Sequence, residues 1–141
     1  MKPFPIENGI WRGARPTDQE LPAIAAQFRT VLSLEGATED AKEAKELPTV
    51  KLVSEPITFW EIYLSGISQR RLSDILAQVE EADKPILVHC QHGEDRTGLV
   101  IAAYRVRVDG WSKQTAMDEA LKFGYRNWLN FGLNRTWAAF S

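Results

Sequence analysis

"ILVHCQHGEDRTGLVIAAY", residues Ile86 to Tyr104, joins two apolar segments through a short run of mostly polar residues. The first segment is short and rich in aliphatic residues, which predicts a buried strand ending near His89. After Arg96 the chain is apolar nearly all round, as is typical of a helix packed against the middle of a sheet. A strand that turns into a helix in this way indicates an α/β fold.

The same alternation continues on both sides of this unit. Strands are predicted at 9–13, 30–34 and 49–54, and helices at 17–28, 36–47, 68–82, 112–123 and 127–140. The first helix begins either at a Thr17–Glu20 capping box or slightly later, at Pro22. The segment 55–68 has no clean period, and we interpret it as a long loop or lid with exposed aromatic residues. We therefore expect a single α/β domain over residues 1–141, with a mostly parallel central sheet flanked by helices.

Composition narrows the class of protein further. The chain has 141 residues, of which 44% are hydrophobic and 26% charged, values typical of a globular domain. A formal net charge of -2 gives no general attraction to nucleic acid or to an anionic membrane. A single cysteine cannot form an internal disulfide, and no apolar run approaches the roughly 20 residues needed to cross a bilayer. No signal peptide is visible, so we expect a cytoplasmic protein, although a leader removed from the natural chain would leave the same pattern.

The loop from Cys90 to Arg96, here called the cysteine loop, would lie at the carboxyl edge of the sheet, where ligands of α/β proteins bind. Its backbone N–H groups and the N-terminus of the following helix can surround a tetrahedral oxyanion. Gly93 would permit a tight turn or a positive φ, and the guanidinium of Arg96 can hold two oxygens of the anion at once. Such a field typically lowers the pKa of a cysteine thiol from about 8.5 to about 3.5–7.5 and makes it a nucleophile.

"HCQHGEDRTG" resembles the His-Cys-x5-Arg-Thr/Ser signature of the cysteine-dependent protein tyrosine phosphatases, especially their compact bacterial dual-specificity type. "IWRGARPTDQELPAI", "TVLSL" and "GYRNWLNFGLNRTW" are similar to further landmarks of that group. The resemblance implies that Cys90 attacks phosphorus and forms a phosphocysteine. Arg96 and the loop residues Gln91, His92, Gly93 and Glu94 would bind the phosphate, His89 would orient the loop, and Thr97 would donate to the departing sulfur. It implies no metal and no cofactor.

The family usually protonates the leaving group with an aspartate on a mobile loop about thirty residues before the cysteine. The corresponding segment, "EPITFWEIYLSG", contains no aspartate. Asp95, inside the cysteine loop, is the first candidate for this acid, and Glu61 is the second; Glu55 is less well placed. Alternatively no acid exists, and substrates with good leaving groups are preferred.

The sequence leaves the substrate open among phosphorylated molecules. Phosphotyrosine-like or small phosphomonoesters are the first expectation, and inositol polyphosphates, as in the related phytases, are the alternative. The cysteine loop has no lysine and carries two carboxylates, although Arg12, Arg15, Arg126 and Arg135 could line the pocket. An RNA 5′-triphosphatase fits less well because the chain is acidic, and no nucleic-acid partner is expected. A phosphate-binding pseudophosphatase, which lacks turnover, is the remaining hypothesis.

Overall fold

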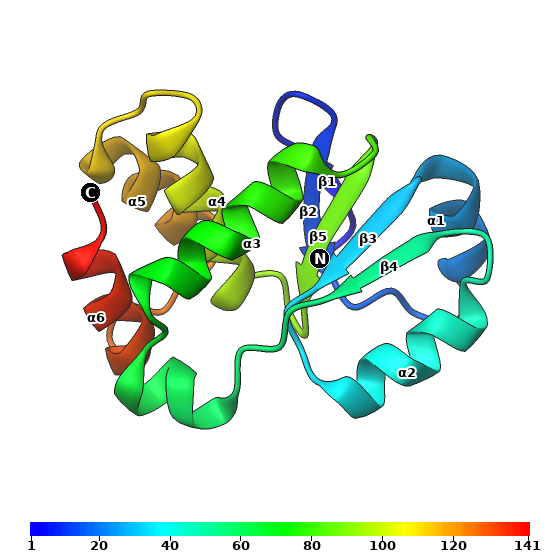
Figure 1. The fold of residues 1–141 in the computed structure, drawn as a ribbon, viewed down its shortest axis with the longest axis horizontal. Helices are drawn as coiled ribbons and strands as arrows, with labels where there is room; N and C mark the ends of the chain where they lie inside the picture. Colours follow the sequence, from blue (N-terminus) through cyan, green and yellow to red (C-terminus); the bar gives the residue numbers. More distant parts are fainter.

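The computed structural model describes all 141 residues and has a five-stranded sheet at its centre, in the order β1-β2-β5-β3-β4 (Figure 1). β5 (Ile86–Cys90) is the middle strand and pairs in parallel with both of its neighbours. The other strands are β1 (Phe4–Pro5), β2 (Ile10–Ala14), β3 (Thr30–Ser33) and β4 (Lys51–Ser54). Only β1 runs antiparallel. The predicted α/β fold with a mostly parallel sheet is confirmed, whereas β1 is not predicted because a two-residue strand carries no periodicity.

Six α-helices cover the two faces of the sheet (Figure 1). They are α1 (Leu21–Gln27), α2 (Ala37–Glu46), α3 (Gln69–Glu81), α4 (Arg96–Arg107), α5 (Lys113–Lys122) and α6 (Phe131–Ala139). The first helix starts at the later of the two predicted positions, with Pro22 in its first turn. The Glu20 carboxylate also accepts the Thr17 amide N–H, which is one of the two contacts of the predicted capping box. The predicted elements therefore occur in the expected order, with β1 and a short helix in 55–68 as additions.

Two hydrophobic cores form because successive residues of a strand point to opposite faces of the sheet. Leu32, Ile86 and Val88 join a large core with α3 and α4, whereas Val31 and Leu87 join a small one with residues of α1. α4 is buried along most of its length, from Thr97 to Arg105, which agrees with its apolar sequence. The middle strand and most of α4 are thus buried, and the cysteine loop connects them.

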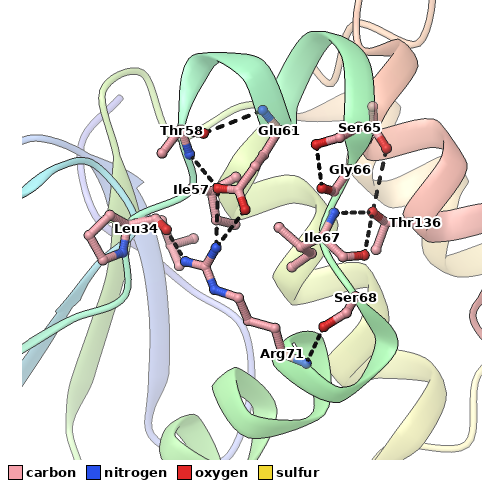
Figure 2. A network of polar contacts seen from close by, with 12 residues as sticks. Leu34, Ile57, Thr58, Glu61, Ser65, Gly66, Ile67, Ser68, Arg71 and Thr136 are labelled. Atoms are coloured by element: carbon pink, nitrogen blue, oxygen red, sulfur yellow. Dashed lines mark hydrogen bonds and ion pairs between the residues drawn. The ribbon is translucent and has the colours of Figure 1, made fainter.

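The segment 55–68 is more ordered than the predicted loop or lid. Residues Glu61–Ser65 form a short π-helix, η1, which packs against α6. Figure 2 shows the contacts that order this segment. The Glu61 carboxylate accepts a hydrogen bond from the Thr58 amide N–H at 2.8 Å and another from the Arg71 guanidinium at 2.9 Å. Farther along, the Thr136 hydroxyl accepts the Ile67 amide N–H at 2.8 Å. The sequence pattern misses this order because Arg71 and Thr136 lie outside the segment that they hold.

Close contact between η1 and α6 depends on Gly132. A Cβ atom at this position would collide with the Glu61 carbonyl oxygen and come within 2.8 Å of the Gly66 nitrogen. Gly132→Ala should therefore lower the free energy of unfolding by about 1–3 kcal/mol, because the obstructing atoms belong to the backbone and cannot rotate away. Urea unfolding at neutral pH measures this loss.

Gly36→Ala is the matched control, since an added Cβ there meets only the flexible carboxylate of Glu39. It should cost less than about 1 kcal/mol, the scale of a changed helix N-cap. Equal losses in the two variants would contradict the role assigned to Gly132.

Candidate active site

The register of the parallel strands places Cys90 at the carboxyl edge of the sheet. Cys90 is the last residue of β5 and lies opposite Ala14 of β2. It is buried and forms no disulfide. α4 begins six residues later at Arg96, so the positive end of a long, buried helix faces the cysteine loop. The strand, loop and helix predicted around the thiol are all present.

The cysteine loop is fixed against β2 and the residue that follows it. The Arg15 amide N–H donates to the Gln91 carbonyl oxygen at 3.3 Å, and Arg12 Nη2 donates to the Gly93 carbonyl oxygen at 3.0 Å. Gly93 has the expected positive φ, at 75°. A Cβ on Gly93 would lie 2.6 Å from the Gly13 carbonyl carbon. Only glycine allows both this backbone angle and this approach to β2.

Arg96 is held by the backbone of two neighbouring segments. Its Nη1 atom donates to the carbonyl oxygens of Leu34, at 3.3 Å, and Ile57, at 3.2 Å. Leu34 follows β3, and Ile57 precedes η1. No carboxylate lies within ion-pairing distance of this guanidinium, so its positive charge is available to an anion.

A cavity of about 210 Å³ opens beside the thiol. Its lining residues come from the cysteine loop, η1 and the turn before α6: Ile62, Tyr63, Cys90, Gln91, His92, Asp95, Arg96 and Arg126. Five of the residues predicted for the site therefore share one cavity. Ile62 and Tyr63 are additions that the sequence did not indicate, because the position of η1 depends on contacts with distant elements. Arg126, one of the arginines considered for the pocket, is also present.

The other predicted site residues lie around the cavity and not in its lining. Gly93 faces β2, and Thr97 is fully buried in the first turn of α4, where its hydroxyl has no hydrogen-bond partner. The Glu94 side chain lies against Gly124. Glu61 is absent from the lining, and its carboxylate binds Arg71 (Figure 2).

Asp95 joins the cysteine loop to the segment before α6. Its carboxylate accepts the Arg126 amide N–H at 3.0 Å, Arg126 Nε at 3.1 Å and Asn130 Nδ2 at 2.6 Å, and it also forms an ion pair with Arg126 Nη2. Burial alone would raise the pKa of Asp95, but the hydrogen bonds from Arg126 and Asn130 outweigh it and lower the pKa below its ordinary value. A carboxylate in this setting stays ionised and acts as an acceptor.

Glu61 is in a similar electrostatic setting. Burial favours its neutral form, yet the Thr58 amide N–H and the Arg71 guanidinium together lower the pKa of Glu61 below its ordinary value. A general acid needs a raised pKa so that it holds a proton near neutral pH. The surroundings of both candidate acids therefore favour the ionised form.

His89 lies beneath the thiol and outside the cavity. The imidazole is fully buried, with Nε2 2.9 Å from a Glu43 carboxylate oxygen and Nδ1 3.3 Å from the Cys90 carbonyl oxygen. A Glu35 carboxylate oxygen lies 3.6 Å from Nδ1, and Arg15 forms an ion pair with Glu35. These contacts support the expectation that His89 orients the loop. The sequence does not indicate a role for Glu35 and Glu43, because glutamates in polar segments are usually exposed.

No group of three or more histidine, cysteine, aspartate or glutamate side chains is arranged to hold a metal ion. None of the helices combines the length and the apolar character that a membrane-spanning segment requires.

Comparison with known proteins agrees with this geometry. The family model "Dual specificity phosphatase, catalytic domain" matches residues 28–129. The chain is 31% identical over 119 residues to the dual specificity protein phosphatase TpbA of Pseudomonas aeruginosa (strain UCBPP-PA14), covering 82% of this chain and 51% of TpbA. It is 27% identical over 122 residues to the inositol diphosphatase DSP1 of Oryza sativa subsp. japonica, covering 84% of this chain and 54% of that protein. The chain thus spans about half the length of these relatives.

Among solved structures, a crystal structure of P. aeruginosa TpbA in complex with pTyr is similar to this chain with a TM-score of 0.76 and 27% identity. The match covers 98% of this chain and 81% of that one. The shared fold therefore includes nearly every element described above.

The ion pair of Asp95 predicts a pH-dependent contribution to stability. Because the folded-state pKa is lowered, the contribution is fully present above the unfolded pKa of about 3.9 and is lost as the pH falls through the lower folded value. Asp95→Asn should reduce the free energy of unfolding by about 1–3 kcal/mol at pH 7, and the difference from wild type should shrink below about pH 4. Urea unfolding from pH 7 to pH 3 measures it, with the exposed Asp118→Asn as control. A difference that stays constant over this range would exclude the ionised contact.

Proposed function

Because this chain belongs to the dual specificity phosphatase family, we propose that it hydrolyses phosphomonoesters through a phosphocysteine intermediate at Cys90. One observation carries the proposal: the only thiol of the chain borders the same cavity as the guanidinium of Arg96, which has no carboxylate partner. A phosphate in that cavity would meet the thiol on one side and the positive end of α4 with Arg96 on the other.

In the first step the Cys90 thiolate attacks phosphorus. The S–P bond forms, the P–O bond to the leaving group breaks, and the electron pair departs on the ester oxygen. Arg96 and the loop amides of Gln91, His92 and Glu94 would bind the equatorial oxygens, whose charge must be stabilised in the transition state. The two carbonyl contacts of Arg96 hold its guanidinium in place before the substrate arrives.

In the second step a water molecule attacks the phosphocysteine. A new P–O bond forms, the S–P bond breaks with its electron pair on sulfur, and both protons of the water leave with the inorganic phosphate. Thr97 is the proposed donor to this sulfur, because its hydroxyl is fully buried near the start of α4 and has no other hydrogen-bond partner. His89 would hold the Cys90 backbone in position through the nearby carbonyl.

The hydrogen bonds of Asp95 and Glu61 make both residues poor candidates for the general acid. Asp95 is bound by Arg126 and Asn130, and Glu61 is bound by Arg71, so each carboxylate is committed as an acceptor. We assign Asp95 a positioning role, in which it holds Arg126 beside the cavity. Glu61 holds η1 in place. The leaving oxygen then departs with little protonation from these residues, which corresponds to the third possibility considered from the sequence.

The cavity favours aryl phosphates as substrates. Tyr63 and Ile62 supply an apolar wall opposite the cysteine loop, and Phe59 packs edge-on against Tyr63 with ring centroids 4.7 Å apart. A phenyl ring can pack against such a wall, and a phenolate is a better leaving group than an alkoxide. Phosphotyrosine is the natural substrate of this chemistry, and the pTyr complex of TpbA is in line with it.

Inositol polyphosphates are the second candidate. Arg126 borders the cavity and is partly exposed, and the rice relative is an inositol diphosphatase. Against this, Asp95 neutralises Arg126, and the cysteine loop adds no lysine to bind a second phosphate. A pseudophosphatase is disfavoured because Cys90 and Arg96 are both present and share the cavity.

A series of phosphate esters tests the proposed chemistry. Wild-type kcat/KM should fall by at least about tenfold, or 1.4 kcal/mol in the transition state, from para-nitrophenyl phosphate to phenyl phosphate and again to an alkyl phosphate. Cys90→Ser should abolish turnover while the protein stays folded. An inositol polyphosphate that is hydrolysed tenfold faster than a phosphotyrosine peptide would favour the second candidate.

Glu61→Gln and Asp95→Asn decide whether either carboxylate donates a proton. In each variant, kcat/KM should depend on the leaving group as it does in the wild type. It should not fall selectively for esters with poor leaving groups. A steeper dependence in one variant, with the basic limb of its pH profile abolished, would identify that residue as the acid and contradict the positioning role.

A further inference from the structure

Arg12 is a fully buried arginine in the middle of β2, next to the cysteine loop. No carboxylate forms an ion pair with it, although the chain's other fully buried arginine, Arg105, has three acidic partners. Arg12 has one hydrogen bond, to the Gly93 carbonyl oxygen, and the Phe123 ring lies 4.1 Å from its guanidinium carbon. Nε and Nη1 have no partner at all. Burying a guanidinium with two unpaired nitrogens lowers stability, and we therefore expect Arg12 to have a functional role.

The guanidinium carries its charge at neutral pH. Burial lowers the pKa of Arg12 to about 10, because desolvation outweighs the attraction of Glu119 and Cys90. Arg12 therefore stays protonated across the pH range in which phosphatases work.

The contact with Gly93 also fixes the orientation of a backbone amide. In a planar trans peptide the C=O and the following N–H point in opposite directions. Since the Gly93 carbonyl points toward Arg12 in β2, the Glu94 N–H points away from β2. Arg15 acts in the same way through its amide, which holds the Gln91 carbonyl and turns the His92 N–H away. The anion-binding face of the loop thus depends on donors in and beside β2.

We propose that Arg12 is a positioning residue of the catalytic machinery: its guanidinium holds the Gly93–Glu94 peptide in the anion-binding orientation. This inference rests on the proposed phosphate-binding role of the cysteine loop. The close approach of Gly93 to Gly13 supports it, because it brings this part of the loop against β2, where the Arg12 guanidinium binds the Gly93 carbonyl.

Three variants separate the charge of Arg12 from its hydrogen bond. Arg12→Met removes both, and Arg12→Lys retains a charge but not the planar fork that reaches the Gly93 carbonyl while facing Phe123. Arg105→Met is the matched control, since Arg105 is also buried and also faces an aromatic ring, that of Trp111, but has no contact with the loop. Circular dichroism and thermal melting establish which variants are folded.

Vanadate affinity is the readout, because it needs no turnover. In Arg12→Met it should fall by about tenfold or more, because an anion-binding amide is then misplaced.

The control and the lysine variant make the result specific. Arg12→Lys, which keeps the charge but loses the hydrogen bond, should also lose vanadate affinity, whereas Arg105→Met should leave it unchanged. A folded Arg12→Met with wild-type vanadate affinity would overturn the proposal. If Arg12→Met does not fold, wild-type vanadate affinity in Arg12→Lys overturns it instead. A wild-type protein that binds vanadate but hydrolyses no ester would refute the proposed function and leave the role of Arg12 standing.

Discussion

Parallel pairing of β2 with β5 is the contact on which the site depends. The register sets Ala14 beside Cys90, so the end of β2 lies under the cysteine loop as it leaves the sheet. From there β2 and its extension supply Arg12 and Arg15, which hold two carbonyl groups of the loop. The close contact between Gly13 and Gly93 brings the two backbones together. A loop held in this way has its amides oriented before any ligand binds, and this preorganisation gives a polar site its strength.

Charged residues around the thiol divide into two sets. Among the arginines that contact the loop or line the cavity, Arg12 and Arg96 have no carboxylate partner, whereas Arg15 is paired with Glu35 and Arg126 with Asp95. The acidic residues are used to hold structure together: Asp95 holds the turn before α6, and Glu61 holds η1. The unpaired arginines thus leave positive charge for an anion, while the hydrogen bonds of Asp95 and Glu61 keep these two carboxylates from acting as proton donors.

Much of this arrangement is legible from the sequence because it is local. The strand, the loop with its glycine at a positive φ, and the helix after Arg96 follow one another in the chain, and their order alone predicts a site at the sheet edge. The sequence marked Arg12 only as an arginine that could line the pocket, whereas it is buried in β2 and absent from the lining. Its burial could have been expected, since it shares with Ile10 the alternate positions of a strand. The order within 55–68 could not have been predicted, because Arg71 and Thr136 stabilise it from outside.

The sequence by itself determined the fold class, the family resemblance and the choice of Cys90 and Arg96 as proposed nucleophile and phosphate ligand, because each depends on residues that are neighbours in the chain. Only the tertiary structure decided the direction in which the pKa values of the candidate acids shift and the walls of the cavity. Asp95 meets Arg126 and Asn130, and Tyr63 borders the same cavity as the thiol, through packing of α6 against η1 and α4. A carboxylate's pKa is set by the charges and donors that surround it in space, and sequence distance carries almost no information about those neighbours.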